Sequence, residues 1–182
     1  MQQPLLYVIL AAVAAVALAV GGALLVRYGW KRFVRRRVVR LIGRREAVRA
    51  GERTLRAVVV RLAEAPDDEI AAFAADPGDE DRRSLSDVVA RMEVQADDLV
   101  RMPLPKGLWS AGELLADAAW RLGTEAGRVA GAGGAEEVLE RLAGIDLIAV
   151  RDAVAAAEAE IVRLEEDHGV EEEAVYGGGL YI

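Results

Sequence analysis

The sequence predicts an all-α protein: a single N-terminal transmembrane helix followed by a cytoplasmic antiparallel helical bundle of three to four helices. Three observations lead to this fold class. Residues 5–26 contain no charged side chain, a run of arginines follows directly, and the rest of the chain repeats apolar residues at helical spacing between prolines and glycines. No convincing strand pattern precedes the last residues.

The apolar stretch of residues 5–26 is long enough for one membrane crossing, since a helix rises about 1.5 Å per residue and the hydrocarbon core is roughly 30 Å thick. A cleaved signal peptide is the main alternative, because Ala17-Leu18-Ala19 resembles a cleavage site. A signal peptide, however, carries its positive charge ahead of about 7 to 15 apolar residues. Here the charge follows a longer stretch, whose length also argues against a buried core helix. We therefore predict that residues 1–27 form an uncleaved anchor.

Positive charge accumulates on the cytoplasmic side of membrane proteins. The arginines behind the anchor therefore place the N-terminus outside and the remainder in the cytoplasm, at the plasma or inner membrane. Aromatic residues at the same position are typical of the headgroup level. The predicted membrane-interface residues are Tyr28, Trp30, Lys31, Arg32, Phe33, Arg35, Arg36, Arg37 and Arg40.

Residues 28–65 continue as a basic amphipathic helix, which either lies on the membrane surface or projects straight from it, with Gly43 and Gly51 as possible bending points. Each arginine near an anionic leaflet adds about 1 kcal/mol of attraction, so anionic lipid headgroups are predicted partners. The alternative is that these charges only set the topology.

The net charge of −7 divides into +11 for residues 27–61 and −18 for residues 62–182. A basic region, residues 27–61, therefore precedes an acidic body, residues 62–182; we call the basic region the cationic collar. Clustered cations also attract the phosphates of nucleic acids, but no recognition helix and no aromatic side chains for base stacking accompany them. We predict no nucleic-acid partner.

Residues 66–169 are predicted to form the acidic bundle. Three long helices are expected to begin at the N-cap Ser84, at a capping box formed by Ser110 and Glu113 with a staple from Trp109 to Leu114, and at the N-cap Asp146. Shorter helices cover residues 70–75 and 135–143, and the last long helix should end at a left-handed glycine, Gly169. Because short connections make neighbouring helices antiparallel, the three form a bundle, to which residues 55–62 could add a fourth helix.

Residues 170–182 are predicted to be a flexible C-terminal tail. Its apolar residues either pack back on the bundle or bind another protein by strand addition. The candidate partner-binding residues are Tyr176, Leu180, Tyr181 and Ile182.

The sequence offers little chemistry. It has no cysteine and one histidine, and Ser110 lacks the first glycine of a nucleophile elbow. The glycines of residues 131–134 follow no strand, and no phosphate-binding loop occurs. The acids around His168 lack metal-site spacing. Gln95 and Glu125 are polar residues at positions of the apolar helical repeat, and we call them the two polar seam residues. They are expected to face each other or a buried arginine such as Arg121 or Arg151.

We therefore predict no catalytic residue, metal, cofactor or small-molecule substrate. The predicted function is that of a membrane-anchored docking or assembly module, not an enzyme, which binds an unknown protein or associates with itself. The alternative, from another class, is a membrane-tethered enzyme or metal-dependent regulator that uses the acidic C-terminal region.

Overall fold

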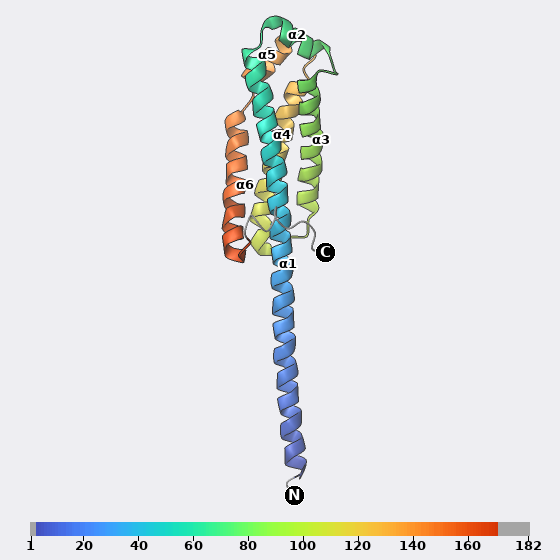
Figure 1. Ribbon diagram of the computed structural model, residues 1–182, viewed down its shortest axis with the longest axis vertical. Helices are drawn as coiled ribbons and strands as arrows, with labels where there is room; N and C mark the ends of the chain where they lie inside the picture. The colour runs from blue at the N-terminus through green and yellow to red at the C-terminus, as the bar shows by residue number, and fades with distance from the viewer. Residues whose placement is uncertain (1–2, 171–182) are drawn as a thin grey trace. The chain divides into compact units, whose positions relative to one another are not determined.

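The computed structural model is built from helices, and it describes the backbone of residues 3–170 and the side chains of residue 18 and residues 20–170. No strand occurs in this part of the chain, so the all-α prediction is confirmed. The elements are α1 (Gln3–Glu64), α2 (Asp67–Ala75), α3 (Glu80–Arg101), the 3-10 turn η1 (Lys106–Leu108), α4 (Trp109–Ala130), α5 (Ala135–Ala143) and α6 (Leu147–His168) (Figure 1).

The chain divides into two compact units, residues 1–37 and residues 38–182, so that the boundary falls inside α1. Residues 38–64 are thus grouped with the helices that follow them, whereas the sequence suggested a separate juxtamembrane helix over residues 28–65. The physical reason is burial: Val38, Leu41, Val48 and Leu55 have no exposed surface, because the other bundle helices cover them. The fourth bundle helix, expected only from residues 55–62, is therefore this longer part of α1.

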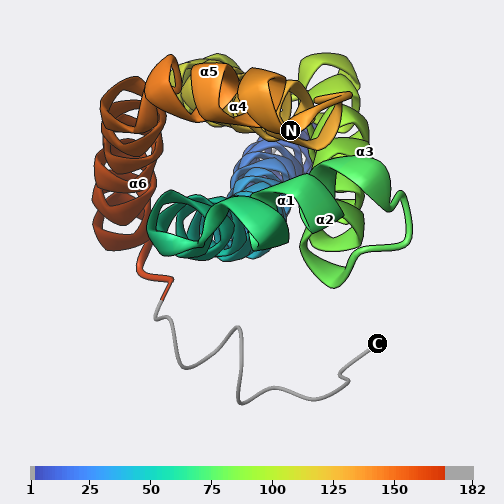
Figure 2. The same cartoon turned by 90° about the horizontal axis from the view of Figure 1, so that it is seen from above.

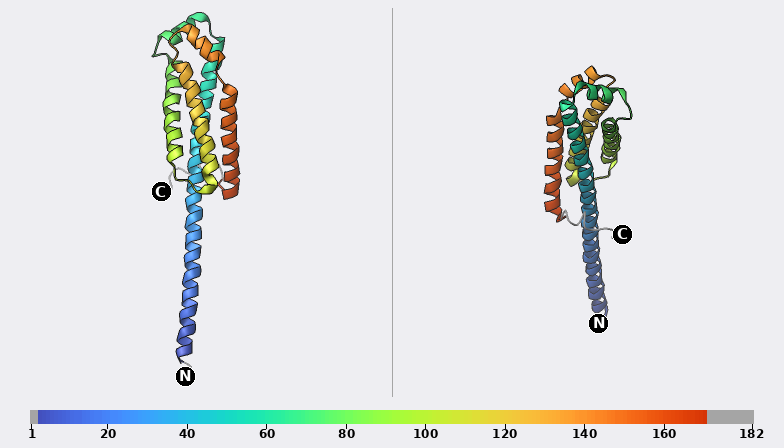
Figure 3. Two further views of the ribbon diagram at one scale, coloured as in Figure 1. Left: turned by 180° about the vertical axis from the view of Figure 1, so that it is seen from behind. Right: turned by 45° about the horizontal axis from the view of Figure 1, so that its top comes forward.

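Within the second unit, residues 38–64 of α1 and helices α3, α4 and α6 run alternately up and down (Figure 1). Viewed along the bundle, α1 lies between α3 and α6 (Figure 2). Helices α2 and α5 contact each other at the end where α1 stops, and η1 joins α3 to α4 at the opposite end (Figure 3). Short connections impose this antiparallel order, as predicted.

Small residues allow the helices of the second unit to approach closely. On α4, Ala111, Ala118 and Ala126 are fully buried. On α1, a Cβ added to Gly51 would lie 2.9 Å from Cδ2 of Leu122, which is closer than real Cβ contacts. The glycine that we expected as a bending point therefore serves to pack α1 against α4.

The predicted helix ends are partly right. Asp146 accepts a hydrogen bond from the backbone N–H of Ala149 at 2.8 Å, and Gly169 adopts φ 58°, so both predictions are confirmed. The N-cap prediction for Ser84 is wrong: α3 begins a turn earlier because Asp79 accepts from the N–H groups of Asp81 and Arg82. The capping box at Ser110 is also wrong, since α4 continues directly from η1 and Ser110 lies inside the helix.

One arginine ties three helix ends together. Arg82 of α3 donates to the backbone carbonyl oxygens of Ala74, Ala130 and Ala132 at 2.9, 2.9 and 3.2 Å. The carbonyls of Ala74 and Ala130 lie in the last turns of α2 and α4, where the last carbonyl groups of a helix have no partner within the helix, and Ala132 lies in the link that follows α4. A single guanidinium thus satisfies several of them.

In the first unit, residues 3–37 are helical, and the exposed apolar side chains ahead of Tyr28 include Leu18, Val20, Leu24, Leu25 and Val26. No helix that is long and apolar enough to cross a membrane is found among the residues described. The predicted span of residues 5–26 falls largely on residues 5–17 and 19, whose side chains lie outside the described part.

Candidate functional site

The predicted membrane-interface residues form what we call the cationic–aromatic segment, residues 28–40. In the first unit, Tyr28 and Trp30 are exposed, and the rings of Trp30 and Phe33 lie 5.7 Å apart between centroids. The guanidinium of Arg37 lies 5.1 Å from the Phe33 ring centroid, within cation–π distance. Among the described residues, no acid forms an ion pair with the cations of this segment, which are Lys31, Arg32, Arg35, Arg36, Arg37 and Arg40.

Four arginines beyond residue 43 behave differently, because they pair with acids of other helices of the bundle. Arg44 binds Asp98 of α3 at 2.8 Å. On the other side of α1, Arg45 and Arg49 bind acids of α6 at 3.0 and 2.8 Å, and Arg61 pairs with α3. The acidic partners of the last three are Glu165, Glu158 and Asp81. The cationic collar of the sequence thus contains residues 28–40, whose cations form no ion pair with a described acid, and four arginines further on that bind other helices of the bundle.

Arg45 is the most buried charged residue of this set, with 3 % of its surface exposed. Its guanidinium donates to Glu46 at 3.1 Å and to Glu165 at 3.0 Å, and the Glu165 side chain is 13 % exposed. Sequence reasoning missed this pair. The available signal was spacing: residue 45 follows Leu41 by four and precedes Val48 by three, which places it on the apolar face of the helix.

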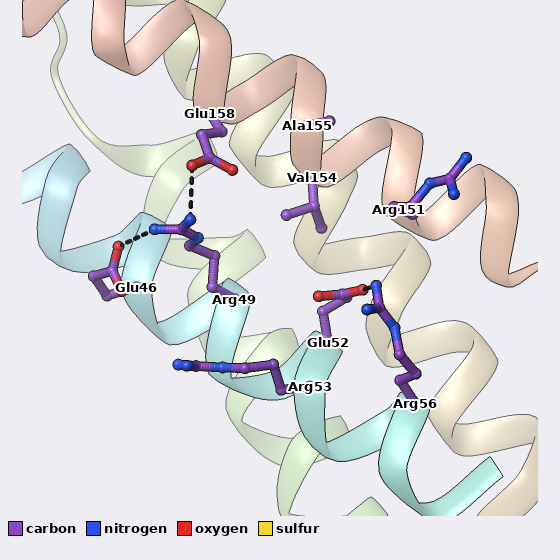
Figure 4. Close-up of a pocket in the computed structure, with 9 residues that line it drawn as sticks. All are labelled: Glu46, Arg49, Glu52, Arg53, Arg56, Arg151, Val154, Ala155 and Glu158. Atoms are coloured by element: carbon purple, nitrogen blue, oxygen red, sulfur yellow. Dashed lines mark hydrogen bonds and ion pairs between the residues drawn. The ribbon is translucent and has the colours of Figure 1, made fainter. Parts of the chain in front are cut away.

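A charged groove lies between α1 and α6, with a volume of about 350 Å³ (Figure 4). Arg49 lies between Glu46 and Glu158, and Arg56 pairs with Glu52. Four arginines face three glutamates here, and most are engaged with one another, so the groove has little net charge. It is lined by Glu46, Arg49, Glu52, Arg53, Arg56, Arg151, Val154, Ala155 and Glu158. The arrangement supports a structural ion-pair network more than an anion site.

The two polar seam residues find other partners than predicted. Gln95 Oε1 accepts a hydrogen bond from Arg44 at 2.8 Å, and Glu125 pairs with Arg128 on its own helix at 3.1 Å. The arginines proposed for them are exposed: Arg121 pairs with Asp117, and Arg151 with Asp152. A contact between Gln95 and Glu125 is not found among the described residues. Gln95 does bind an arginine, as the other alternative predicted, but this arginine is Arg44 of α1, which is half-buried.

An apolar groove, which we call the Trp109 groove, lies where α3 ends and α4 begins, with a volume of about 490 Å³. The indole N–H of Trp109 donates to the carbonyl oxygen of Leu104 at 2.8 Å and so holds the ring at the groove. Gly112 leaves room for Leu104, since an added Cβ would lie 2.5 Å from its Cδ1. The lining residues are Leu99, Val100, Met102, Leu104, Trp109, Gly112, Glu113 and Ala116.

Two carboxylates on the bundle surface have a lowered pKa because of donors close to them in the sequence. A hydrogen bond from Arg163 and the charge of that arginine lower the pKa of Glu160, against a smaller opposing effect of burial, and the same contact raises the pKa of Arg163. The backbone N–H of Gly133 donates to Glu137 at 2.7 Å and is the main reason that the pKa of this carboxyl is lowered. These pairs stabilise helix ends and surfaces.

In the part of the chain that the structure describes, no group of three His, Cys, Asp or Glu residues is placed to hold a metal ion. His168 is within that part, in the last turn of α6. The acids of residues 171–173 and the candidate tail residues Tyr176, Leu180, Tyr181 and Ile182 lie outside it.

No known protein family, curated protein or solved structure matches this chain. Its function is therefore inferred from the geometry of the cationic–aromatic segment, the ion pairs and the two grooves.

Proposed function

We propose that this chain is a single-pass membrane protein whose helical bundle is a docking or assembly module held on the cytoplasmic face. The observation that carries the proposal is the cationic–aromatic segment: its aromatic rings are exposed and its cations lack acidic partners among the described residues. Such a segment suits the headgroup level of a membrane, where rings and cations both have favourable surroundings.

The exposed apolar residues that precede this segment support the same proposal. Leu18, Leu25 and Val26 expose 77 %, 74 % and 73 % of their surface. Burial of one such side chain away from water is worth about 1.5–3 kcal/mol, so a row of them on one helix is unfavourable in water and favourable in lipid. The charge-free stretch of residues 5–26 continues this pattern in the sequence.

The cationic–aromatic segment has a specific role, because its cations differ from the arginines that bind acids of the bundle. Arg44, Arg45, Arg49 and Arg61 are engaged with acids of α3 and α6, so they contribute to the bundle. The cations of residues 31–40 are the ones left to meet anionic lipid headgroups and to hold the topology. Each cation near an anionic leaflet contributes about 1 kcal/mol of attraction, so these cations together would bind the headgroups firmly.

A docking role, with no catalytic step, fits the charges of the bundle. The carboxylates and guanidiniums around the groove between α1 and α6 mostly bind one another, which leaves few groups to act on a substrate. The proposed partners are anionic lipid headgroups and either an unknown protein or a second copy of the chain. No nucleic acid, cofactor or small-molecule substrate is part of the proposal.

Topology reporters test the anchoring. With a fluorescent protein fused after Ile182 the cells should fluoresce, an alkaline phosphatase fused at the same place should be inactive, and alkaline carbonate should not release the chain from membranes. Active phosphatase or release by carbonate would overturn the proposal.

A matched pair of variants tests the role of the segment. Replacing the four arginines Arg35, Arg36, Arg37 and Arg40 by glutamine should leave a fraction of the chain inverted, because the positive charge that sets the orientation is reduced. Replacing four exposed arginines of the bundle removes the same charge and should change nothing; these are Arg83, Arg91, Arg101 and Arg121. An equal effect of both sets would show that the segment has no special role.

Crosslinking in native membranes tests the docking role. A reproducible product of the chain with one protein, or with a second copy of itself, is the expected result. If the chain remained in the membrane but gave no crosslinked product, the proposed docking role would be refuted and the proposed membrane anchoring would not.

A further inference from the structure

The Trp109 groove is an apolar surface that lacks an occupant among the described residues. Val100 on its α3 side exposes 78 % of its surface, and Trp109 on its α4 side exposes 52 %. Tryptophans at the rim of an apolar hollow are frequent anchors of binding sites. Leu99, Leu104 and Ala116 add apolar lining between them.

We propose that the C-terminal segment of the same chain, residues 175–182, occupies the Trp109 groove. Apart from a run of three glycines, this segment consists of apolar and aromatic residues: Val175, Tyr176, Leu180, Tyr181 and Ile182. Such side chains gain free energy from burial in an apolar hollow, and the groove presents that surface.

The topology of the bundle brings the segment near the groove. Helices α4 and α6 are antiparallel neighbours, so that the last turn of α6, at His168, lies at the same end of the bundle as the first turn of α4, at Trp109 (Figure 1). Val170, which follows α6, is buried and keeps the chain against the bundle at this end.

The length of chain beyond Val170 is sufficient. Neighbouring helix axes lie about 8–10 Å apart, so the far side of α4 is roughly 20 Å from α6. Twelve residues, 171–182, span up to about 40 Å when extended, at about 3.3 Å per residue. Residues 175–182 can therefore reach the groove within one molecule.

The charges agree with this placement. Residues 171–173 are all glutamate, and they precede the apolar segment. Lys106, in the turn that leads into Trp109, is exposed and forms no ion pair among the described residues. Acidic residues that pass this turn would meet a cation before the apolar segment enters the groove.

When residues 175–182 occupy the Trp109 groove, they compete with any other protein that binds there. A protein that docks on the Trp109 groove would first have to displace residues 175–182. This inference concerns the second unit alone, so it stands or falls independently of membrane anchoring.

Disulfide crosslinking in the full-length protein tests the proposal, because the chain has no cysteine of its own. Val100→Cys is combined with Tyr181→Cys, and the protein is oxidised in its native membrane. The control pair is Ile148→Cys with Tyr181→Cys, since Ile148 is exposed at the first turn of α6, at the opposite end of the bundle. Mass spectrometry of the digested monomer should show the intramolecular disulfide forming about tenfold faster in the first pair than in the control.

Two results would overturn the proposal. Equal rates in the two pairs would mean that the segment has no preference for the groove. A disulfide found only between two chains would assign the groove to the segment of a second copy.

A second measurement avoids the need to crosslink. In the single variant Val100→Cys, a maleimide should react several-fold more slowly with the full-length chain than with a chain that ends at Ala174. Ile148→Cys should react equally in both lengths. The shorter chain is a suitable comparison, because truncation at Ala174 removes none of the described residues. Equal reactivity of Val100→Cys in both lengths would refute occupation of the groove.

Discussion

Removing one partner of the buried pair between Arg45 and Glu165 should destabilise the bundle far more than removing one partner of an exposed pair. Changing Glu165 to Gln keeps the size of the side chain and removes its charge. The guanidinium of Arg45, 3 % exposed, then keeps Glu46 at 3.1 Å but loses the α6 carboxylate at 3.0 Å. The buried charge of Arg45 then has one carboxylate fewer beside it.

The structure allows an estimate of the cost. Breaking a buried ion pair by removing one partner costs about 3–5 kcal/mol. Because Glu46 remains in contact, and is itself 29 % exposed, we expect a value at or below the lower end of this range, about 2–3 kcal/mol. For a chain of this size, each 1 kcal/mol lowers Tm by about 2–4 °C, which gives a fall of about 4–12 °C.

Thermal melting followed by circular dichroism, in a mild detergent, measures this fall. Asp97→Asn is the matched control, since the pair of Asp97 with Arg101 is 70 % and 79 % exposed and should change Tm by no more than about 2 °C. Replacing both Arg45 and Glu165 by methionine should restore the melting temperature to near that of the parent, because no buried charge is left.

Two results would refute this reasoning. One is a Glu165→Gln variant that melts like Asp97→Asn, which would show that burial does not raise the cost of breaking the pair. The other is a double methionine variant that is less stable than either single change, which would show that the charges are needed together.

Three further predictions concern helix ends and packing. Arg82→Met should lower Tm by about 4–12 °C, since several helix-end carbonyls lose a charged donor worth about 2–3 kcal/mol together, whereas Arg83→Met should have little effect; equal melting of the two would contradict it. Gly51→Leu should destabilise the protein by about 1–3 kcal/mol, because its Cβ would meet Leu122, while Gly43→Leu, with open space around it, should be neutral or stabilising; the same sign for both would be inconsistent with the close packing of α1. Glu137 has a folded pKa below its ordinary value, mainly through the N–H of Gly133, so its contribution is present above the ordinary carboxyl range and is lost as the pH falls through the lowered pKa. The difference in Tm between the parent and Glu137→Gln should accordingly shrink in acid, and a difference independent of pH would exclude this titration.

Features that depend on neighbouring residues were predictable from the sequence. The bounds of α5, the N-cap Asp146 and the left-handed Gly169 were predicted correctly, because each depends on contacts within about four residues. The antiparallel order followed from short connections. Local rules failed where two candidates compete within a turn: Asp79, not Ser84, caps α3.

Contacts between distant residues were not predictable in this way. The partner of Arg44 lies 54 residues away and that of Arg45 lies 120 residues away, and several acids on each helix could have filled either role. The same holds for Gly51, whose need for glycine depends on Leu122 of another helix.

The sequence by itself therefore determined the helical class, the helix count to within one and the separation of a basic region from an acidic body. Tertiary structure decided which arginines of that basic region bind other helices of the bundle and which form no ion pair with a described acid, and it placed Trp109 beside an apolar groove. The reason is geometric. Composition records how many charges a chain carries, but an ion pair or a groove forms only when rotation and packing of separate helices bring particular side chains within a few ångströms of each other.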